Sequence, residues 1–149
     1  MIKARLGARN NAAFSLTYHL VLVTKHRRKA LSPEMLSRAE GILAEVLRDW
    51  RCELVEFGGE ADHLHLLFRA HPAMELSRLV NNLKTVSSRL LRKEFAEHLA
   101  KFYWKPVLWH GAYYVGTVGD ASLATVRHYV ETQGRGRWPG RSKTGDRPA

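Results

Sequence analysis

Hydrophobic and polar residues alternate along four segments of the chain, and this alternation predicts β-strands. The four segments are residues 15–25, 52–60, 63–70 and 108–119. Gly58 and Gly59 close the second segment shortly before the third begins. Two strands this close together, separated by a turn signal, are expected to pair as a hairpin.

Three other segments repeat their apolar residues every three or four positions, which predicts amphipathic helices. They are residues 32–50, 74–95 and 120–134. Ser32 is a suitable N-cap and Pro33 suits the first helical position, so the first helix has a defined start. Gly134 supplies a left-handed stop for the last helix, which is expected to span about three turns.

The order of these elements predicts the fold class. A strand–helix–strand–strand–helix–strand order is that of an α+β, ferredoxin-like or RRM-like antiparallel sheet with two helices on one face, here followed by a C-terminal helix. We expect a single domain over residues 1–134 and a basic, flexible tail over residues 135–149, which is rich in Gly, Pro and Arg. The second face of such a sheet is expected to be open.

The third predicted strand separates two kinds of side chain. Leu64, Leu66 and Phe68 fall on one face, which we expect to pack against the helices. His63 and His65 fall on the other face, which we expect to be the open one. Two histidines on one face of this strand require an explanation.

Charge narrows the class of partner. The 149-residue chain has 24 Lys plus Arg against 14 Asp plus Glu, which gives a formal net charge of +10. Such an excess favours a polyanionic partner, nucleic acid first and an anionic membrane surface second. Sixteen of the basic residues are arginine, whose planar guanidinium binds phosphate and stacks on bases, and this favours nucleic acid.

Two basic clusters are candidate DNA-binding surfaces. The first is the stretch KHRRK, which follows the first predicted strand, and the second lies on the polar side of the helix predicted for residues 74–95. An ordinary solvated surface is the alternative for the helical stripe. The candidate residues are Arg27, Arg28, Lys29, Arg78, Arg89, Arg92 and Lys93.

Cysteine content and hydropathy bear on the compartment. Cys52 is the single cysteine, so the chain can form neither an internal disulfide nor a cysteine-based zinc site. No apolar run approaches the ~18–20 residues that cross a bilayer, and the first residues lack the pattern of a signal peptide. We expect a cytoplasmic protein that has no membrane partner.

The histidine pair is chemically suggestive but weak by itself. Two imidazoles at alternate strand positions stand roughly 7 Å apart and can bind one divalent cation, although packing and surface histidines show the same spacing. A metal site needs further ligands. The last predicted helix places Tyr129 and Gln133 four residues apart on one flank. Taken alone, Tyr129 also fits the edge of a core, and Gln133 also fits a solvated position.

Together these motifs resemble the single-tyrosine HUH transposases of the insertion-sequence 200/605 type (TnpA-like). The resemblance is carried, in family order, by YHLVLVTKHRRKAL, ADHLHLLF, LVNNLKTVSSRLLRKEF, LWHGAYYVGTVG and VRHYVETQ. It implies a metal-dependent endonuclease and strand transferase that cuts and rejoins single-stranded DNA at hairpin-bearing element ends. By position, it implies His63, His65 and Gln133 as metal ligands and Tyr129 as the catalytic nucleophile.

The residue types agree with that chemistry. Two nitrogens, one amide oxygen and phosphate oxygens suit Mg²⁺ or Mn²⁺ better than a closed zinc site. The expected product is a 5′-phosphotyrosine with a free 3′-hydroxyl, which can be rejoined without ATP. Tyr113 and Tyr114 are rival nucleophiles, but they lie in a predicted strand without a helical partner ligand.

The resemblance also implies an assembly and a location. Members of the family work as homodimers in which each tyrosine helix completes the histidine site of the partner. A prokaryotic protein of this kind is expected to be associated with the nucleoid when it is bound to DNA.

Two alternatives remain open at the level of sequence. One is a domesticated relative that acts on repetitive extragenic palindromes, for which the arginine-rich tail leaves room. The other is a non-catalytic, ferredoxin-like RNA-binding module, which is disfavoured because the strand HLHLLFRA lacks exposed aromatic residues for base stacking. Such a module should bind without Mg²⁺ or Mn²⁺ and should form no covalent product.

Overall fold

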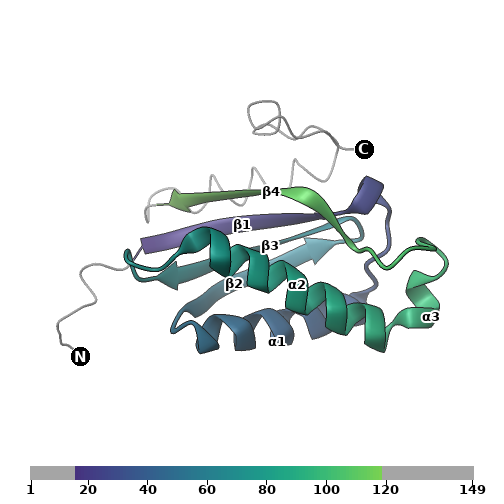
Figure 1. The fold of residues 1–149 in the computed structure, drawn as a ribbon, viewed down its shortest axis with the longest axis horizontal. Coiled ribbons are helices and arrows are strands. Elements are labelled where there is room, and N and C mark those ends of the chain that lie inside the picture. The colour runs from purple at the N-terminus through teal and green to yellow at the C-terminus, as the bar shows by residue number, and fades with distance from the viewer. Residues whose placement is uncertain (1–15, 119–149) are drawn as a thin grey trace.

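The computed structural model describes residues 16–118, and these residues form an α+β unit (Figure 1). The predicted last helix, the tail, Tyr129 and Gln133 lie outside the described residues. Within them, every predicted strand and helix is confirmed, with ends that shift by one or two residues. The elements are β1 (Leu16–Thr24), η2 (Lys25–Arg27), α1 (Pro33–Asp49), β2 (Glu53–Glu60), β3 (His63–Ala70), α2 (Leu76–Glu94), α3 (Ala96–Leu99) and β4 (Trp109–Val118).

The strands form one four-stranded sheet in the order β2-β3-β1-β4, and every neighbouring pair is antiparallel. Helices α1 and α2 lie together across one face of the sheet (Figure 1). The split connection, in which β3 inserts next to β1, is the ferredoxin-like arrangement. β1 and β3 therefore occupy the centre of the sheet, where side chains on both faces have neighbours.

Helix α1 has a capped start, and an ion pair joins the two long helices. The Ser32 hydroxyl accepts a hydrogen bond from the Met35 backbone N–H at 3.1 Å, which confirms the predicted N-cap of α1. The Arg38 guanidinium of α1 donates two hydrogen bonds, of 2.7 and 2.9 Å, to the Glu94 carboxylate at the end of α2. α1 and α2 are thus held side by side.

The main core lies between this helical layer and the sheet. Leu64, Leu66 and Phe68 of β3 are fully buried there, as predicted. They join alternate residues of β1 and the apolar stripes of α1 and α2, and together these side chains form the buried interface between the two layers. The helix-facing half of the β3 pattern is therefore structural.

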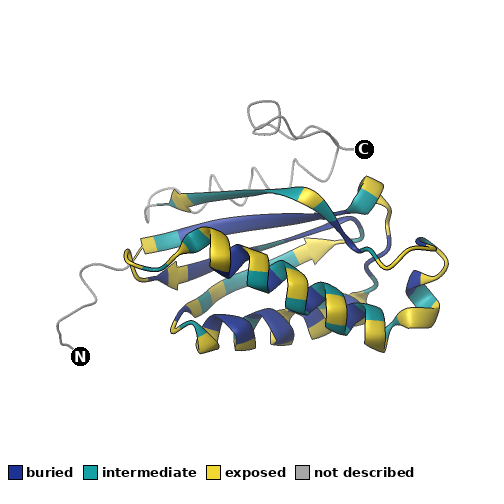
Figure 2. Ribbon diagram, viewed as in Figure 1, coloured by how far each residue is buried: buried dark blue, intermediate teal, exposed yellow. Residues whose placement is uncertain are grey.

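The expectation that the second face is open is wrong at the centre of the sheet. Val21, Val23 and Leu67 form a second buried cluster there, and His63 is only 2% exposed. Figure 2 shows β1 and β3 as buried along most of their lengths. The physical reason is visible in β1, whose run LVLV is apolar at consecutive positions and so places apolar side chains on both faces of the sheet.

One end of the sheet gathers three chain segments. The Thr24 N–H at the end of β1 donates to the Asp62 carbonyl just before β3, at 3.1 Å. The next N–H, of Lys25, donates to the Leu108 carbonyl just before β4, at 2.7 Å. The η2 turn that follows holds His26 and Arg27 at positive φ values of 60° and 54°. Non-glycine residues rarely adopt this backbone region, and it is often found at functional sites.

No helix between residues 16 and 118 is long and apolar enough to cross a membrane.

Candidate active site

The two histidines of β3 lie on the same face of the sheet, opposite the helices. In the strand register, His63 pairs with Val23 of β1 and with Glu60 of β2. His65 pairs with Val21 of β1 and with Gly58 of β2. His63 is buried and His65 is half-buried. The pair therefore sits beside a buried apolar patch, where an ionic interaction is stronger than in water.

Asp62 holds His63 from the side. Its Oδ1 lies 3.0 Å from His63 Nδ1, and its Oδ2 accepts a hydrogen bond of 3.0 Å from Arg27 Nη2. A carboxylate at Nδ1 favours the tautomer in which Nδ1 carries the proton and Nε2 keeps its lone pair. This is the arrangement that prepares an imidazole to bind a cation through Nε2.

The environment keeps Asp62 ionised. Burial acts to raise the pKa of the Asp62 carboxyl, but the hydrogen bond from His63 and the charge of Arg27 outweigh burial, so the pKa is lowered. Both carboxylate oxygens already have partners within the chain. Asp62 is therefore better placed to orient His63 than to bind a metal directly.

Glu60 is a candidate ligand that the sequence-based reasoning missed. Ligand atoms of Glu60, Asp62 and His63 all lie within 4.8 Å of one another. Because Glu60 and His63 are directly opposed in the β2–β3 hairpin, their side chains emerge on the same face. Glu60 is exposed, so its carboxylate can reach a cation at little desolvation cost.

A glycine makes room for the second histidine. A Cβ on Gly58 would lie only 2.6 Å from His65 Nε2, a distance that real structures do not tolerate. The His65 ring thus occupies the space that any other residue at position 58 would fill. This explains the glycine within a strand, where glycine is otherwise unfavourable.

The two rival tyrosines of β4 lie on opposite faces. Tyr113 packs against the main core, and its ring lies 5.3 Å from Lys84 Nζ. Tyr114 lies on the histidine face, opposite Val21, with its ring centroid 4.7 Å from that of His19. Tyr114 therefore shares a cross-strand row with His65 and is the stronger of the two rivals.

The predicted DNA-binding residues separate into two regions. Arg27 and Arg28 flank the end of β1, where Arg27 pairs with Asp62, while Lys29 is exposed. Along α2, Arg78 pairs with Glu75 at 2.9 Å, and Arg92 Nε donates to Ser88 Oγ at 3.1 Å. The exposed residues of the helical set are Arg78, Arg89 and Lys93.

The structure brings together His63 and His65 but gives no position for Tyr129 or Gln133, which lie outside the described residues. Within residues 16–118, the two predicted histidines lie on one face of the sheet, and their role as metal ligands stays a prediction. Asp62 adds a carboxylate that orients His63, and Arg27 adds its counter-charge. Glu60 adds an acidic neighbour, and Gly58 leaves the space that the His65 ring occupies.

Comparisons with known proteins identify the family of this chain. The family model described as "Transposase IS200 like" matches residues 12–133. The transposase for insertion sequence element IS200 of Salmonella typhimurium is 34% identical over 117 residues, which cover 78% of this chain and 75% of that protein. The similarity therefore extends over most of both chains.

Two solved structures share the fold. One, a transposase candidate from Deinococcus radiodurans, is 32% identical and superposes with a TM-score of 0.69 over 89% of this chain and 98% of its own. The other, a REP-associated tyrosine transposase bound to a REP hairpin, is 14% identical with a TM-score of 0.53, over 78% of this chain and 62% of its own, and shows the fold alone. The family match spans both strands of the histidine hairpin and most of the chain, and the chain belongs to the IS200-like transposase family.

Proposed function

We propose that this transposase cleaves and rejoins single-stranded DNA at hairpin-bearing element ends, with Tyr129 as nucleophile and a cation held by His63, His65 and Gln133. One observation carries the proposal furthest. Asp62, itself held by Arg27, orients His63 within a paired-histidine face. Burying these charged and polar groups costs desolvation free energy, and packing alone does not require it.

The residues present fit a divalent cation. Imidazole Nε2 atoms, an amide oxygen and the oxygens of a phosphate form a mixed set that suits Mg²⁺ or Mn²⁺. When bound, such an ion would neutralise charge on the scissile phosphate and lower the pKa of a nearby hydroxyl. Glu60 adds a carboxylate opposite His63, so we include it as a further ligand or as a hydrogen-bond partner of a metal-bound water.

The chemistry on the chain is a transesterification. The Tyr129 hydroxyl gives up its proton as its oxygen attacks phosphorus and a phosphotyrosine bond forms. The bond between phosphorus and the 3′-oxygen of the preceding nucleotide breaks, and that oxygen takes up a proton, so no net proton is consumed. Attack by another 3′-hydroxyl reverses the step and frees Tyr129, so strand joining needs no ATP. A phenol of ordinary pKa near 10 is a weak nucleophile at neutral pH, which is why positioning and charge neutralisation are required.

The proposed substrate follows from charge and from the family. A structural neighbour was solved bound to a REP hairpin, and the present chain carries a net charge of +10. We propose that the basic residues after β1 and along α2 bind the DNA backbone. We also propose a homodimer in which the Tyr129 helix of each subunit completes the histidine site of its partner.

A covalent-adduct assay tests the function. The protein is incubated with Mn²⁺ and labelled single strands that carry the hairpins from the DNA flanking its gene, and the products are separated under denaturing conditions. We expect a protein–DNA adduct that fails to form when a chelator is present from the start, and that fails to form in His63→Ala, whose helix-facing strand residues are untouched. A domesticated relative would cleave genomic palindromes instead of its own flanks, and a non-catalytic RNA-binding module would yield no adduct with any strand.

A further inference from the structure

Trp104 is the most exposed large hydrophobic residue among residues 16–118. Its relative exposure is 89%, compared with 40% for Val55 and 37% for Leu16. It lies in the connection between α3 and β4, next to the buried Tyr103. A tryptophan presented to solvent in this way indicates a binding surface, because the indole is a large apolar group that folding would otherwise bury.

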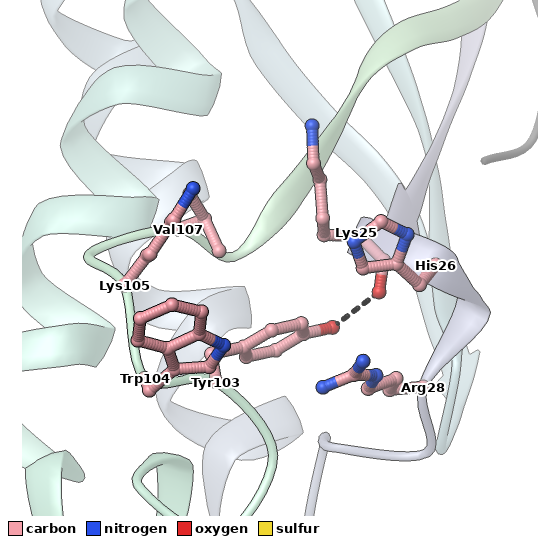
Figure 3. Close-up of a pocket in the computed structure, with 7 residues that line it drawn as sticks. All are labelled: Lys25, His26, Arg28, Tyr103, Trp104, Lys105 and Val107. Atoms are coloured by element: carbon pink, nitrogen blue, oxygen red, sulfur yellow. Dashed lines mark hydrogen bonds between the residues drawn. The ribbon is translucent and has the colours of Figure 1, made fainter.

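Trp104 borders a hollow whose other walls are mostly basic. The hollow has a volume of about 290 Å³, and Lys25, Arg28 and Lys105 line it together with Tyr103 and Trp104. Figure 3 shows the rings of Tyr103 and Trp104 on one side of this space and the guanidinium of Arg28 on the other. A second hollow of about 240 Å³ shares Tyr103, Trp104 and Lys105 and is also lined by Arg92.

The wall of the first hollow is fixed before any ligand binds. The Tyr103 hydroxyl donates a hydrogen bond of 2.6 Å to the Lys25 carbonyl, which ties the loop before β4 to the end of β1 (Figure 3). The Arg28 guanidinium lies 5.5 Å from the centroid of the Tyr103 ring and donates a hydrogen bond to the Phe102 carbonyl. A preorganised wall reduces the ordering cost of binding.

The composition of the two hollows indicates a nucleotide. Among the described residues that line them, none is acidic, so an anion is favoured. A site for phosphate alone needs no exposed indole, and an apolar protein contact needs no ring of cations. Stacking on an aromatic face beside Lys and Arg is the usual way in which proteins bind an unpaired base and its phosphate. The Lys105 ammonium already lies 5.5 Å from the Trp104 ring centroid, close enough to accompany a phosphate there.

We propose that an unpaired nucleotide of the DNA substrate stacks on Trp104, with its phosphates on Arg28 and Lys105. The η2 turn links this pocket to the candidate active site, because Arg27 pairs with Asp62 while the next residue, Arg28, lines the pocket. A strand held at Trp104 is thereby positioned relative to the histidine face. The identity of the bound strand rests on the proposed function, whereas the stacking of a base on Trp104 does not.

Base deletion along the DNA tests the pocket. The probe is a fluorescein-labelled single strand that carries one flanking hairpin. Each unpaired base is replaced in turn by an abasic site. The affinity of the protein for each strand is measured by fluorescence anisotropy in the absence of divalent cations. For the wild type, we expect one position at which loss of the base weakens binding about 5- to 150-fold. Trp104→Ala should weaken binding of the intact strand by the same factor, and the abasic site should then add nothing. Trp104→Phe should retain part of the affinity.

Matched controls separate stacking from charge and from folding. Lys105→Ala should reduce the salt dependence of binding by about 0.7 in log–log slope, whereas the exposed Lys101→Ala, which removes the same charge outside both hollows, should not. Unchanged affinity of Trp104→Ala for every strand would overturn the proposal, as would an effect confined to the oligomeric state.

The adduct assay, run in parallel, keeps the two proposals distinguishable. Adduct formation with no Trp104-dependent base effect would reject the pocket and retain the proposed function. A Trp104-dependent base effect without any adduct would support the pocket and reject the proposed function.

Discussion

His63 Nδ1 lies 3.0 Å from Asp62 Oδ1, and this contact joins a buried imidazole to a carboxylate that Arg27 holds from the other side. The contact fixes which nitrogen of His63 is free. A histidine whose Nδ1 is committed to a carboxylate binds a cation more tightly through Nε2, because the carboxylate raises the basicity of the ring and sets its orientation.

Replacing Asp62 should therefore weaken cation binding without removing a ligand. We expect Asp62→Asn to lower the affinity for Mn²⁺ about 10- to 100-fold, measured by calorimetric titration. Glu53→Gln is the matched control, because it removes an exposed carboxylate from the same hairpin and should leave the affinity unchanged. Wild-type affinity in a folded Asp62→Asn protein would mean that the Asp62–His63 contact has no role in metal binding.

Gly58 provides a steric test of His65. In Gly58→Ala the new methyl group would lie 2.6 Å from His65 Nε2, so the imidazole must leave its position. We expect the affinity for Mn²⁺ to fall about tenfold or more, because the His65 imidazole is displaced from the cation. Gly111→Ala, in β4, meets nothing within 4 Å and should bind Mn²⁺ as the wild type does. Equal affinities for the two alanine variants would place the cation away from His65.

The sequence pattern predicted the elements and the face of the histidine pair because strand periodicity is a local property. It also contained an unused signal for Glu60. A two-residue connection between the predicted strands, Ala61 and Asp62, places residue 60 opposite residue 63. The apolar patch on the second face does not follow from strand alternation, because the run LVLV of β1 is apolar at consecutive positions.

Long-range contacts explain what the sequence did not reveal. The pair of Arg27 with Asp62 and the contact of Lys25 with Tyr103 join residues that are 35 and 78 positions apart, so no local pattern contains them. Arg27 was predicted as a DNA-binding residue from its place in a basic cluster, and the structure adds a specific acidic partner. Its contact with DNA stays a prediction, as do the roles of Tyr129 and Gln133.

The arginines of α2 give an electrostatic prediction. Removing one basic side chain that binds a phosphate of a single strand should reduce the log–log salt slope of binding by about 0.7. Arg89→Ala combined with Arg92→Ala should therefore flatten the slope by up to roughly twice that value. The control is Arg48→Ala combined with Arg51→Gly, which removes the same charge around the end of α1. Glycine replaces Arg51 because the backbone there has a φ of 60°, which glycine adopts without strain. Identical slopes for the two double variants would assign the α2 arginines to plain solvated surface.

His19 gives a prediction about pH. Burial lowers the pKa of His19 below its ordinary value of 6.5, so the unfolded chain binds this proton more readily than the folded chain does. The stability due to neutral His19 is then complete above pH 6.5 and is lost as the pH falls towards the lowered pKa. Urea unfolding at about pH 7.5 and about pH 5.5 should show a smaller acid loss for His19→Gln than for the wild type. Exposed His71→Gln should behave as the wild type, and an equal loss in all three proteins would exclude His19 as the source.

Mapping the residue that carries the DNA tests the catalytic centre most directly. The adduct formed with Mn²⁺ is digested with nuclease and protease, and the peptide that bears the residual nucleotide is sequenced by mass spectrometry. Tyr129→Phe and Tyr114→Phe are assayed beside it, since Tyr114 shares the histidine face. We expect the nucleotide on Tyr129, no adduct in Tyr129→Phe and an adduct in Tyr114→Phe. A nucleotide on Tyr114, or an adduct that persists in Tyr129→Phe, would contradict the proposed centre.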